Sequence, residues 1–349
     1  MDFLSEYDYR LPTELVALEP VSPRDSSRLM VYDTQSDSIQ FDIFAHIDQY
    51  IPSNSSLVLN QTQVVPSRLR LKKEKGKPTD LLFLFNEPQQ YPGLFKVISS
   101  RHLPVGQKLW FDDDHLLTIE KQDERFFYVK PHFPEAILMQ IIDVHGRMPL
   151  PHYLEATSLE EQQLRDRYQT VFASQPGSIA APTASLHFTP ELLKRLEVHR
   201  EILKITHHVG LATFTTVLPE NVKEGRLLEE WYEIEDVVRT KIQNSKFKTQ
   251  NSSEERLVAV GTTAVRALES FARSGEVRGK TDLFIMPPYE FQVVDALVTN
   301  FHLPKTSLMM LVQAFLQYKG AKRSLVELYE MAVRERFRFY SFGDAMLIL

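Results

Sequence analysis

The chain has 349 residues, which is long enough for two or three domains and a sizeable buried core. Its 43% hydrophobic and 25% charged residues are typical of a globular protein and argue against disorder. The net charge of -6 means that any nucleic-acid partner would need a local basic patch. There is no cysteine, which excludes disulfides, thiolate nucleophiles, iron–sulfur clusters and the common structural zinc sites.

The first residues, MDFLSEYDYR, are acidic where a secretory signal needs basic residues, and no apolar core follows them. No run approaches the ~18 apolar residues of a membrane span. We therefore expect a cytoplasmic protein that does not cross a membrane.

Residues 1–61 end in a short apolar run at 56–60, which predicts a buried strand. From about 65 to 132 there follow roughly six short apolar runs, separated by turn sequences such as Lys-Gly-Lys-Pro and Tyr-Pro-Gly. Consecutive strands without a helix predict a small antiparallel barrel or sandwich.

After about residue 150 the pattern becomes mixed. Helix starts are predicted at Ser158 with Glu161, at Thr189 before Pro190 and at Ser324 with Glu327. Strand-like runs alternate with helical patterns, at 202–209, 211–218, 256–261, 282–286 and 291–299. This alternation predicts an α/β domain built from residues 1–61 and 151–349, with a β domain of residues 62–150 inserted between them.

Two segments near strand starts and turns carry polar groups that could hold a substrate. Arg24, Asp25 and Arg28 surround two hydroxyls, and a guanidinium group can grip a carboxylate or phosphate at two points. The alternative is a surface loop with internal ion pairs.

In the segment 178–189 the side chains are small, and His187 could transfer protons. The alternative is a tightly packed turn that contains a hydrogen-bonded histidine.

The adjacent His207 and His208 fall on opposite faces of a predicted strand, so both cannot easily ligate one metal ion. With no thiolate and no HExxH motif, we expect no metal site.

Two further segments lie where strands end. The sequence Gly261-Thr262-Thr263 joins a strand to a helix, whose N-terminus could accept an anionic group, although such a turn is also common without a ligand. Arg266 and Glu269, one turn along, could form an exposed pair. Asn300 and His302 follow the strand that begins near Asp295, where they could bind a ligand or only cap the loop.

Basic residues cluster in two places, and either cluster could follow an RNA backbone or could form a solvated strand edge or helix face. The clusters are Arg68, Arg70, Lys72, Lys73, Lys75 and Lys77, and Lys319, Lys322, Arg323, Arg334, Arg336 and Arg338.

In order, these segments resemble the S-adenosylmethionine:tRNA ribosyltransferase-isomerases of queuosine biosynthesis. The matching strings span nearly the whole chain: PRDSSRL, LVLNQTQVVPSRL, GRMPLPHYL, RYQTVFASQPGSIAAPTASLHFT, HVGLATF, AVGTTAVRALES, VVDALVTNFHLP and RFRFYSFGDAML. The resemblance implies an α/β domain with an inserted closed antiparallel β-barrel, in agreement with the pattern of elements.

The resemblance also implies a reaction. The ribosyl part of S-adenosylmethionine, the co-substrate, is transferred to the aminomethyl group of 7-aminomethyl-7-deazaguanine at the wobble position of tRNA. Rearrangement gives epoxyqueuosine-tRNA and releases adenine and methionine. No metal or prosthetic group is implied, and we expect a monomer.

The resemblance implies two sets of site residues. The catalytic set is His187, His208 and His302 for proton transfer, with Asp295 and Glu230. The substrate-binding set is Arg24, Asp25, Arg28, Thr183, Thr263, Arg266 and Asn300.

One stretch departs from the family pattern. Where members usually show His-x-Met-His-x-Glu, this chain has Gly225 and Leu228 in place of the histidines and retains Glu230. This departure leaves open a diverged paralogue that binds RNA or a nucleotide without turnover. A separate alternative is a metal-dependent hydrolase that uses the histidine-rich segments.

Overall fold

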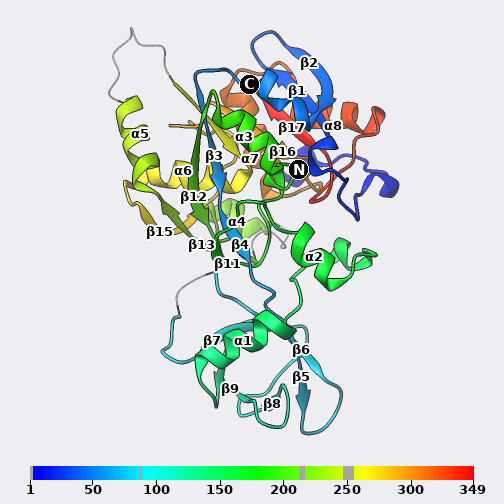
Figure 1. Ribbon diagram of the computed structural model, residues 1–349, viewed down its shortest axis with the longest axis vertical. Helices are drawn as coiled ribbons and strands as arrows, with labels where there is room; N and C mark the ends of the chain where they lie inside the picture. The colour runs from blue at the N-terminus through cyan, green and yellow to red at the C-terminus, as the bar shows by residue number, and fades with distance from the viewer. Residues whose placement is uncertain (1–2, 87–88, 212–216, 247–254) are drawn as a thin grey trace.

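The computed structural model describes residues 3–86, 89–211, 217–246 and 255–349. The described chain forms a large α/β part and, below it in Figure 1, a closed β-barrel. Of the helices in these ranges, none has the length and apolarity that a bilayer crossing requires. The predicted fold class, α/β with an inserted antiparallel barrel, is confirmed.

A nine-stranded mixed sheet forms the centre of the α/β part, in the order β15-β13-β12-β3-β14-β16-β17-β1-β2. The strands are β1 (Arg28–Asp33), β2 (Ser38–Ile43), β3 (Ser55–Asn60), β12 (Glu201–His207), β13 (Arg226–Ile234), β14 (Arg256–Val260), β15 (Arg278–Leu283), β16 (Ala296–Asn300) and β17 (Ala345–Ile348). The central strands β12, β3, β14 and β16 are parallel. Their carboxyl ends therefore meet at one edge of the sheet, where α/β proteins usually bind ligands.

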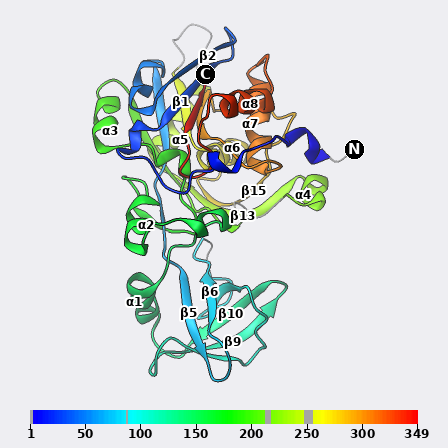
Figure 2. The same ribbon diagram turned by 90° about the vertical axis from the view of Figure 1, so that its right-hand side faces the viewer.

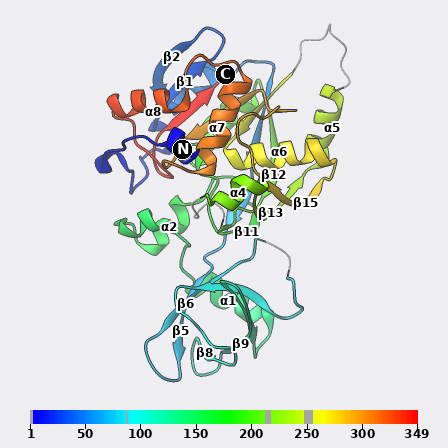
Figure 3. The same ribbon diagram turned by 180° about the vertical axis from the view of Figure 1, so that it is seen from behind.

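Both faces of the sheet are buried. Along β14, Leu257 and Ala259 pack into one core, while Val258 and Val260 pack into the other, as strand geometry requires. The first core includes α5 (Asp236–Lys246), α6 (Thr262–Ser274), α7 (Ser307–Tyr318) and α8 (Leu325–Arg334), and Figure 3 shows α6 and α7 in front of the sheet. The second core includes α3 (Pro190–Glu197) and the 3-10 helix η4 (Phe44–Gln49).

The barrel closes in the order β10-β7-β6-β5-β8-β9, with every pair antiparallel. Its strands are β5 (Arg68–Lys73), β6 (Thr79–Phe83), β7 (Phe95–Ser99), β8 (Lys108–Trp110), β9 (Leu116–Asp123) and β10 (Phe126–Pro131). It has a core of its own, to which α1 (Glu135–His145) contributes. The domain boundaries at residues 61 and 150 stay a prediction. Just beyond the first of them, β4 (Thr62–Val64) pairs with β11 (Gln175–Ser178), not with a barrel strand.

Two of the three predicted helix starts are confirmed. Thr189 caps α3 by accepting a hydrogen bond from the backbone N–H of Leu192 (3.1 Å), and Ser324 forms the capping box of α8 with Glu327.

The predicted start at Ser158 is wrong. Helix α2 (Glu161–Arg167) is capped by Glu160 and Gln163, while the Ser158 hydroxyl donates to the Glu19 carboxylate. The Ser158 hydroxyl, which the local pattern assigned to the helix start, thus bonds to an acidic side chain that is distant in sequence.

Helix α4 (Pro219–Glu224) begins after the predicted strand 211–218, of which residues 212–216 lie outside the described ranges.

Arg266 and Glu269 are not the exposed pair that their spacing suggested, because both are buried. The Glu269 carboxylate accepts hydrogen bonds from the backbone N–H groups of Gln292, Val293 and Val294 (2.9–3.3 Å). Burial raises the pKa of Glu269, although these hydrogen bonds oppose the rise. The carboxylate therefore ties α6 to the segment that leads into β16.

We expect Glu269→Ala to destabilise the protein by about 2–5 kcal/mol, because it leaves three backbone N–H groups, two of them buried, without their acceptor. Urea unfolding in a Trp110→Phe background measures this, since Trp231 is then the sole tryptophan. Loss of the α8 cap in Ser324→Ala serves as the control, with an expected cost of about 1 kcal/mol. Equal urea midpoints for the two variants would contradict the role given to Glu269.

Candidate active site

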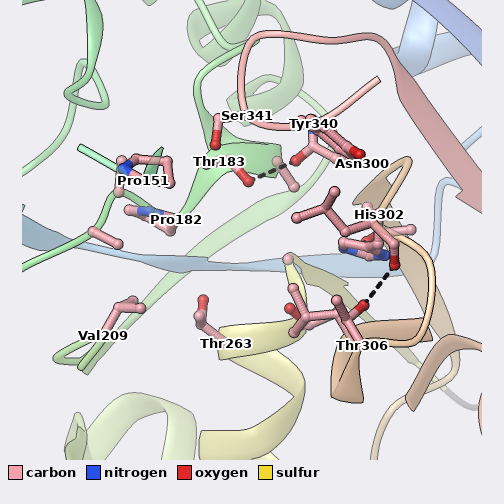
Figure 4. A pocket seen from close by; sticks show the side chains of 18 of the residues that line it. Pro151, Pro182, Thr183, Val209, Thr263, Asn300, His302, Thr306, Tyr340 and Ser341 are labelled. Atoms are coloured by element: carbon pink, nitrogen blue, oxygen red, sulfur yellow. Dashed lines mark hydrogen bonds between the residues drawn. The ribbon is translucent and has the colours of Figure 1, made fainter. Parts of the chain in front are cut away.

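A pocket with about 890 Å³ of empty space, part of it open to solvent, lies at the carboxyl ends of β14 and β16. Figure 4 shows Thr183, Asn300 and Tyr340 on one side of it and Thr263 and Thr306 on the other. Among its described lining residues there is no Asp, Glu, Lys or Arg side chain. The polar groups are hydroxyls, one amide and one imidazole, so the pocket suits a ligand that is largely neutral or carries balanced charges.

Two helices begin at this pocket. Gly261, with a φ of +91°, makes the turn from β14 into α6, and Thr262 and Thr263 start the helix. Thr306 and Ser307 start α7 on the same wall. Unpaired N–H groups at helix N-termini carry partial positive charge, so this wall favours a negatively charged ligand group.

Asn300 is held in one orientation by groups on both sides. Its Oδ1 accepts a hydrogen bond from Thr183 Oγ1 (2.9 Å), drawn in Figure 4, and its Nδ2 donates to His187 Nε2 (3.2 Å). Because Nε2 accepts, the proton of the neutral ring is on Nδ1, which lies 2.8 Å from Ser27 Oγ. Burial lowers the pKa of His187 to about 3, with Arg338 and Arg24 adding to the effect. His187 is thus a neutral support behind Asn300 and does not line the pocket.

His302 lines the pocket directly and is 8% exposed. Its Nδ1 lies 3.1 Å from the Tyr329 hydroxyl, and its Nε2 lies 3.4 Å from Thr299 Oγ1. Burial lowers the pKa of His302 to about 3. The ring is therefore neutral at pH 7; burial makes it a weaker base and makes its protonated form a stronger acid.

Glu230 and Arg266 form a buried ion pair beside the pocket. Glu230 Oε1 accepts a hydrogen bond from the backbone N–H of Gly210 (2.6 Å), and Oε2 accepts one from Arg266 Nη1. His207 Nε2 lies 3.2 Å from the same Oε2. Burial would raise the pKa of Glu230, but Arg266, His207 and the Gly210 amide lower it to about 2. The pair positions the segment at Val209, which lines the pocket, without facing the pocket itself.

His208 lies outside the pocket. Its Nδ1 is 2.8 Å from Thr62 Oγ1, and its ring stacks on Trp231 with centroids 5.1 Å apart. Burial lowers the pKa of His208 to about 4. A side chain at Gly177 would meet Nε2 at 2.6 Å, so the ring requires glycine there. His207 turns the other way, with Nδ1 donating to the Thr263 carbonyl (2.8 Å).

The PRDSSR residues are held by protein groups. Arg24 donates to the carbonyl oxygens of Asp166 and Gln169, Asp25 accepts a hydrogen bond from Thr189, and Arg28 lies over the ring of Phe337 at 3.9 Å. None of the three lines the pocket.

Asp295 lies just before the first residue of β16, at the other end of the strand from Asn300. Its carboxylate accepts a hydrogen bond from the backbone N–H of Leu257 (2.7 Å). The strand thus separates Asp295 from the pocket, and the structure does not bring it together with His302.

Of the twelve site residues predicted from the sequence, the pocket brings together Thr183, Thr263, Asn300 and His302. The structure adds Tyr153, Tyr340 and Ser341, which the sequence argument missed. The Tyr153 and Ser341 hydroxyls are hydrogen-bonded to each other. These residues lie in the GRMPLPHYL and RFRFYSFGDAML strings, so the resemblance carried a signal for them that residue chemistry did not.

Gly225 and Leu228, where the resemblance implies histidines, do not line this pocket. Gly225 ends α4 with a φ of +67°, is exposed and has nothing within 4 Å of where a side chain would begin. Leu228 borders a separate hollow with Asn86, Lys96 and Phe126. In the residues that the structure describes, no three His, Asp or Glu side chains are grouped so that they could hold a metal ion.

Comparison with known proteins covers the whole chain. Residues 4–348 match the model of the family described as queuosine biosynthesis protein. The S-adenosylmethionine:tRNA ribosyltransferase-isomerases of Sulfurihydrogenibium sp. and Rubrobacter xylanophilus are each 42% identical, over 99% of this chain and 99% and 97% of theirs. The crystal structure of S-adenosylmethionine tRNA ribosyltransferase from Thermotoga maritima superposes with a TM-score of 0.54 at 33% identity, covering 99% of this chain and 100% of that one. The chain belongs to the queuosine biosynthesis protein family.

Proposed function

We propose that this protein is an S-adenosylmethionine:tRNA ribosyltransferase-isomerase. It transfers the ribosyl part of S-adenosylmethionine to the aminomethyl group of 7-aminomethyl-7-deazaguanine at the tRNA wobble position. The product is epoxyqueuosine-tRNA, and adenine and methionine are released. The observation that carries the proposal is the 42% identity to an enzyme of this name over 99% of both chains.

The uncharged pocket suits the first chemical step. A base must remove a proton from the carbon beside the sulfonium, whose positive charge makes that proton acidic. No described carboxylate lines the pocket to neutralise the sulfonium. We assign proton acceptance to His302, because it is the one imidazole among the described residues that line the pocket. The resulting imidazolium is a strong acid and returns the proton to the departing adenine.

The other lining groups position the substrate. The start of α6, with Thr263, receives the carboxylate of the methionine portion, since the N–H groups there are the electropositive part of an otherwise uncharged wall. Asn300 and Thr183 orient the nucleoside through their linked amide and hydroxyl. His187, behind Asn300, keeps that amide in place and is a positioning residue.

The alternative function is a paralogue that binds RNA or a nucleotide without turnover. This alternative was suggested by Gly225 and Leu228, which stand where the resemblance implies two histidines. Both positions lie outside the pocket, which favours the enzyme. The metal-dependent hydrolase has no supporting observation, since His207 and His208 face different partners. We further propose that the enzyme acts in the cytoplasm and as a monomer.

Incubation with S-adenosylmethionine and tRNA that carries the deazaguanine precursor should release adenine. We expect His302→Ala to lower kcat by about 10²–10⁴-fold, because it removes the proton acceptor. His208→Gln, outside the pocket, is the matched control and should lose far less. Bound tRNA without adenine release by the unsubstituted protein would reject the enzyme in favour of the binding paralogue.

The proton relay requires a neutral His302 in the folded protein, and the pH dependence of stability tests this. Below pH 6.5 the unfolded chain protonates this histidine, whereas the folded protein does so only near pH 3. Stability should therefore fall as pH drops below 6.5, with His302 contributing about 1.4 kcal/mol per pH unit. In urea titrations between pH 7.5 and 5, His302→Gln should remove that part of the slope.

His199→Gln is the control for the stability measurement, because the His199 side chain is exposed to water in the folded protein as well as in the unfolded one. It should leave the slope unchanged. A slope that His302→Gln and His199→Gln alter equally would contradict a neutral, desolvated His302.

A further inference from the structure

The outer surface of β5 carries a row of cations that begins next to the pocket. Arg68, Arg70 and Lys72 occupy alternate, outward positions of the strand, while Leu69 and Leu71 point into the barrel core. Figure 2 shows β5 running from the junction with the α/β part toward the far end of the barrel. Successive outward side chains are about 7 Å apart, since each strand residue advances about 3.3 Å.

The row continues at both ends of the strand. Lys75 and Lys77 are exposed in the turn that follows β5, and Arg147 is joined to Arg68 by two backbone hydrogen bonds (2.9 and 3.1 Å). We call these six side chains the cationic face: Arg68, Arg70, Lys72, Lys75, Lys77 and Arg147.

Acidic residues only partly balance this face. Glu155 pairs with Arg68 (3.6 Å), Asp80 pairs with Arg147 (2.9 Å), and Glu74 lies in the turn. Six cations against three carboxylates leave about +3 on a chain whose net charge is -6. The acidic turn at 112–114 follows β8 and bounds the face on that side. A local excess of positive charge on an acidic protein indicates a polyanionic partner.

One short helix links the cationic face to the pocket. Arg68 contacts Glu155 in the 3-10 helix η5 (His152–Ala156), and Tyr153 of the same short helix lines the pocket. On the neighbouring strand β8, Trp110 stands opposite Lys72 and is partly exposed. Cations in a row with an aromatic ring beside them match the chemistry of a single-stranded or looped RNA backbone.

We propose that the cationic face binds the phosphate backbone of the tRNA next to the wobble nucleotide, and so delivers that nucleotide to the pocket. This inference rests on the proposed function for the identity of the RNA. The face supplies affinity through phosphates, while the uncharged pocket does the chemistry. Substitution of the cationic face therefore weakens tRNA binding and leaves kcat at saturating tRNA unchanged.

The test compares two double variants that remove equal charge from the same barrel. Arg70→Ala/Lys72→Ala changes the cationic face, and Arg125→Ala/Lys130→Ala changes exposed cations at β10, opposite β5 in the strand order. The dissociation constant for tRNA carrying the deazaguanine precursor is measured by fluorescence anisotropy at several KCl concentrations. Adenine release is followed separately at saturating tRNA.

We expect the β5 variant to bind tRNA about tenfold more weakly at moderate salt and to lower the slope of log K against log[KCl] by about 2, one for each lost phosphate contact. The β10 variant should bind like the unsubstituted protein. Equal weakening by both variants, or by neither, would overturn the proposal. Because binding is measured without turnover, a protein that releases no adenine but shows this difference would refute the proposed function and support the cationic face.

Discussion

The buried ion pair between Glu230 and Arg266 determines how the pocket is built. Removing two charges from water costs several kcal/mol per ion, so such a pair persists only with good geometry and further partners. Here the carboxylate has Arg266, the Gly210 amide and His207 around it, and Arg266 also donates to carbonyl oxygens on β15. The pair joins β13 to α6, the helix that begins at the pocket, and so fixes α6 relative to the sheet.

Helix α6 also fixes the wall of the pocket that bears Asn300. Glu269 lies one turn after Arg266 and accepts the backbone N–H groups that precede β16, the strand whose carboxyl end bears Asn300 and leads to His302. Both walls of the pocket therefore depend on α6. Because these ionisable side chains bond to the protein, they can hold the site without adding charge to it. A pocket bordered by rigid, uncharged groups keeps an adjacent sulfonium poorly solvated, and this increases the acidity of the proton that must be removed.

Local patterns predicted the architecture well, because period and turn chemistry are properties of short segments. The closely spaced strands of the barrel and the caps at Thr189 and Ser324 follow from such segments. Fewer of the predicted site residues line the pocket, because charged residues in motifs were taken to face a ligand. Arg266 and Arg24 instead bond to protein groups that are distant in sequence. Asp295 lies at the end of β16 away from the pocket and accepts a hydrogen bond from the backbone of β14. Nothing in a local pattern reveals a partner that the fold brings from elsewhere.

The pocket and the outer surface of the barrel differ in charge, and each suits its proposed role. Around the reacting atoms a fixed negative charge would neutralise the sulfonium and a fixed positive charge would bind tRNA phosphates there. On the barrel, positive charge raises affinity for RNA at no cost to the chemistry. The hydroxyl-lined pocket and the cations of β5 are separated by one short helix, η5, with Tyr153 at the pocket and Glu155 at Arg68. Phosphate attraction is long-ranged and falls with salt, while the pocket contacts are short-ranged. An acidic chain can thus recruit a polyanion through its inserted barrel and still present it with an uncharged active site.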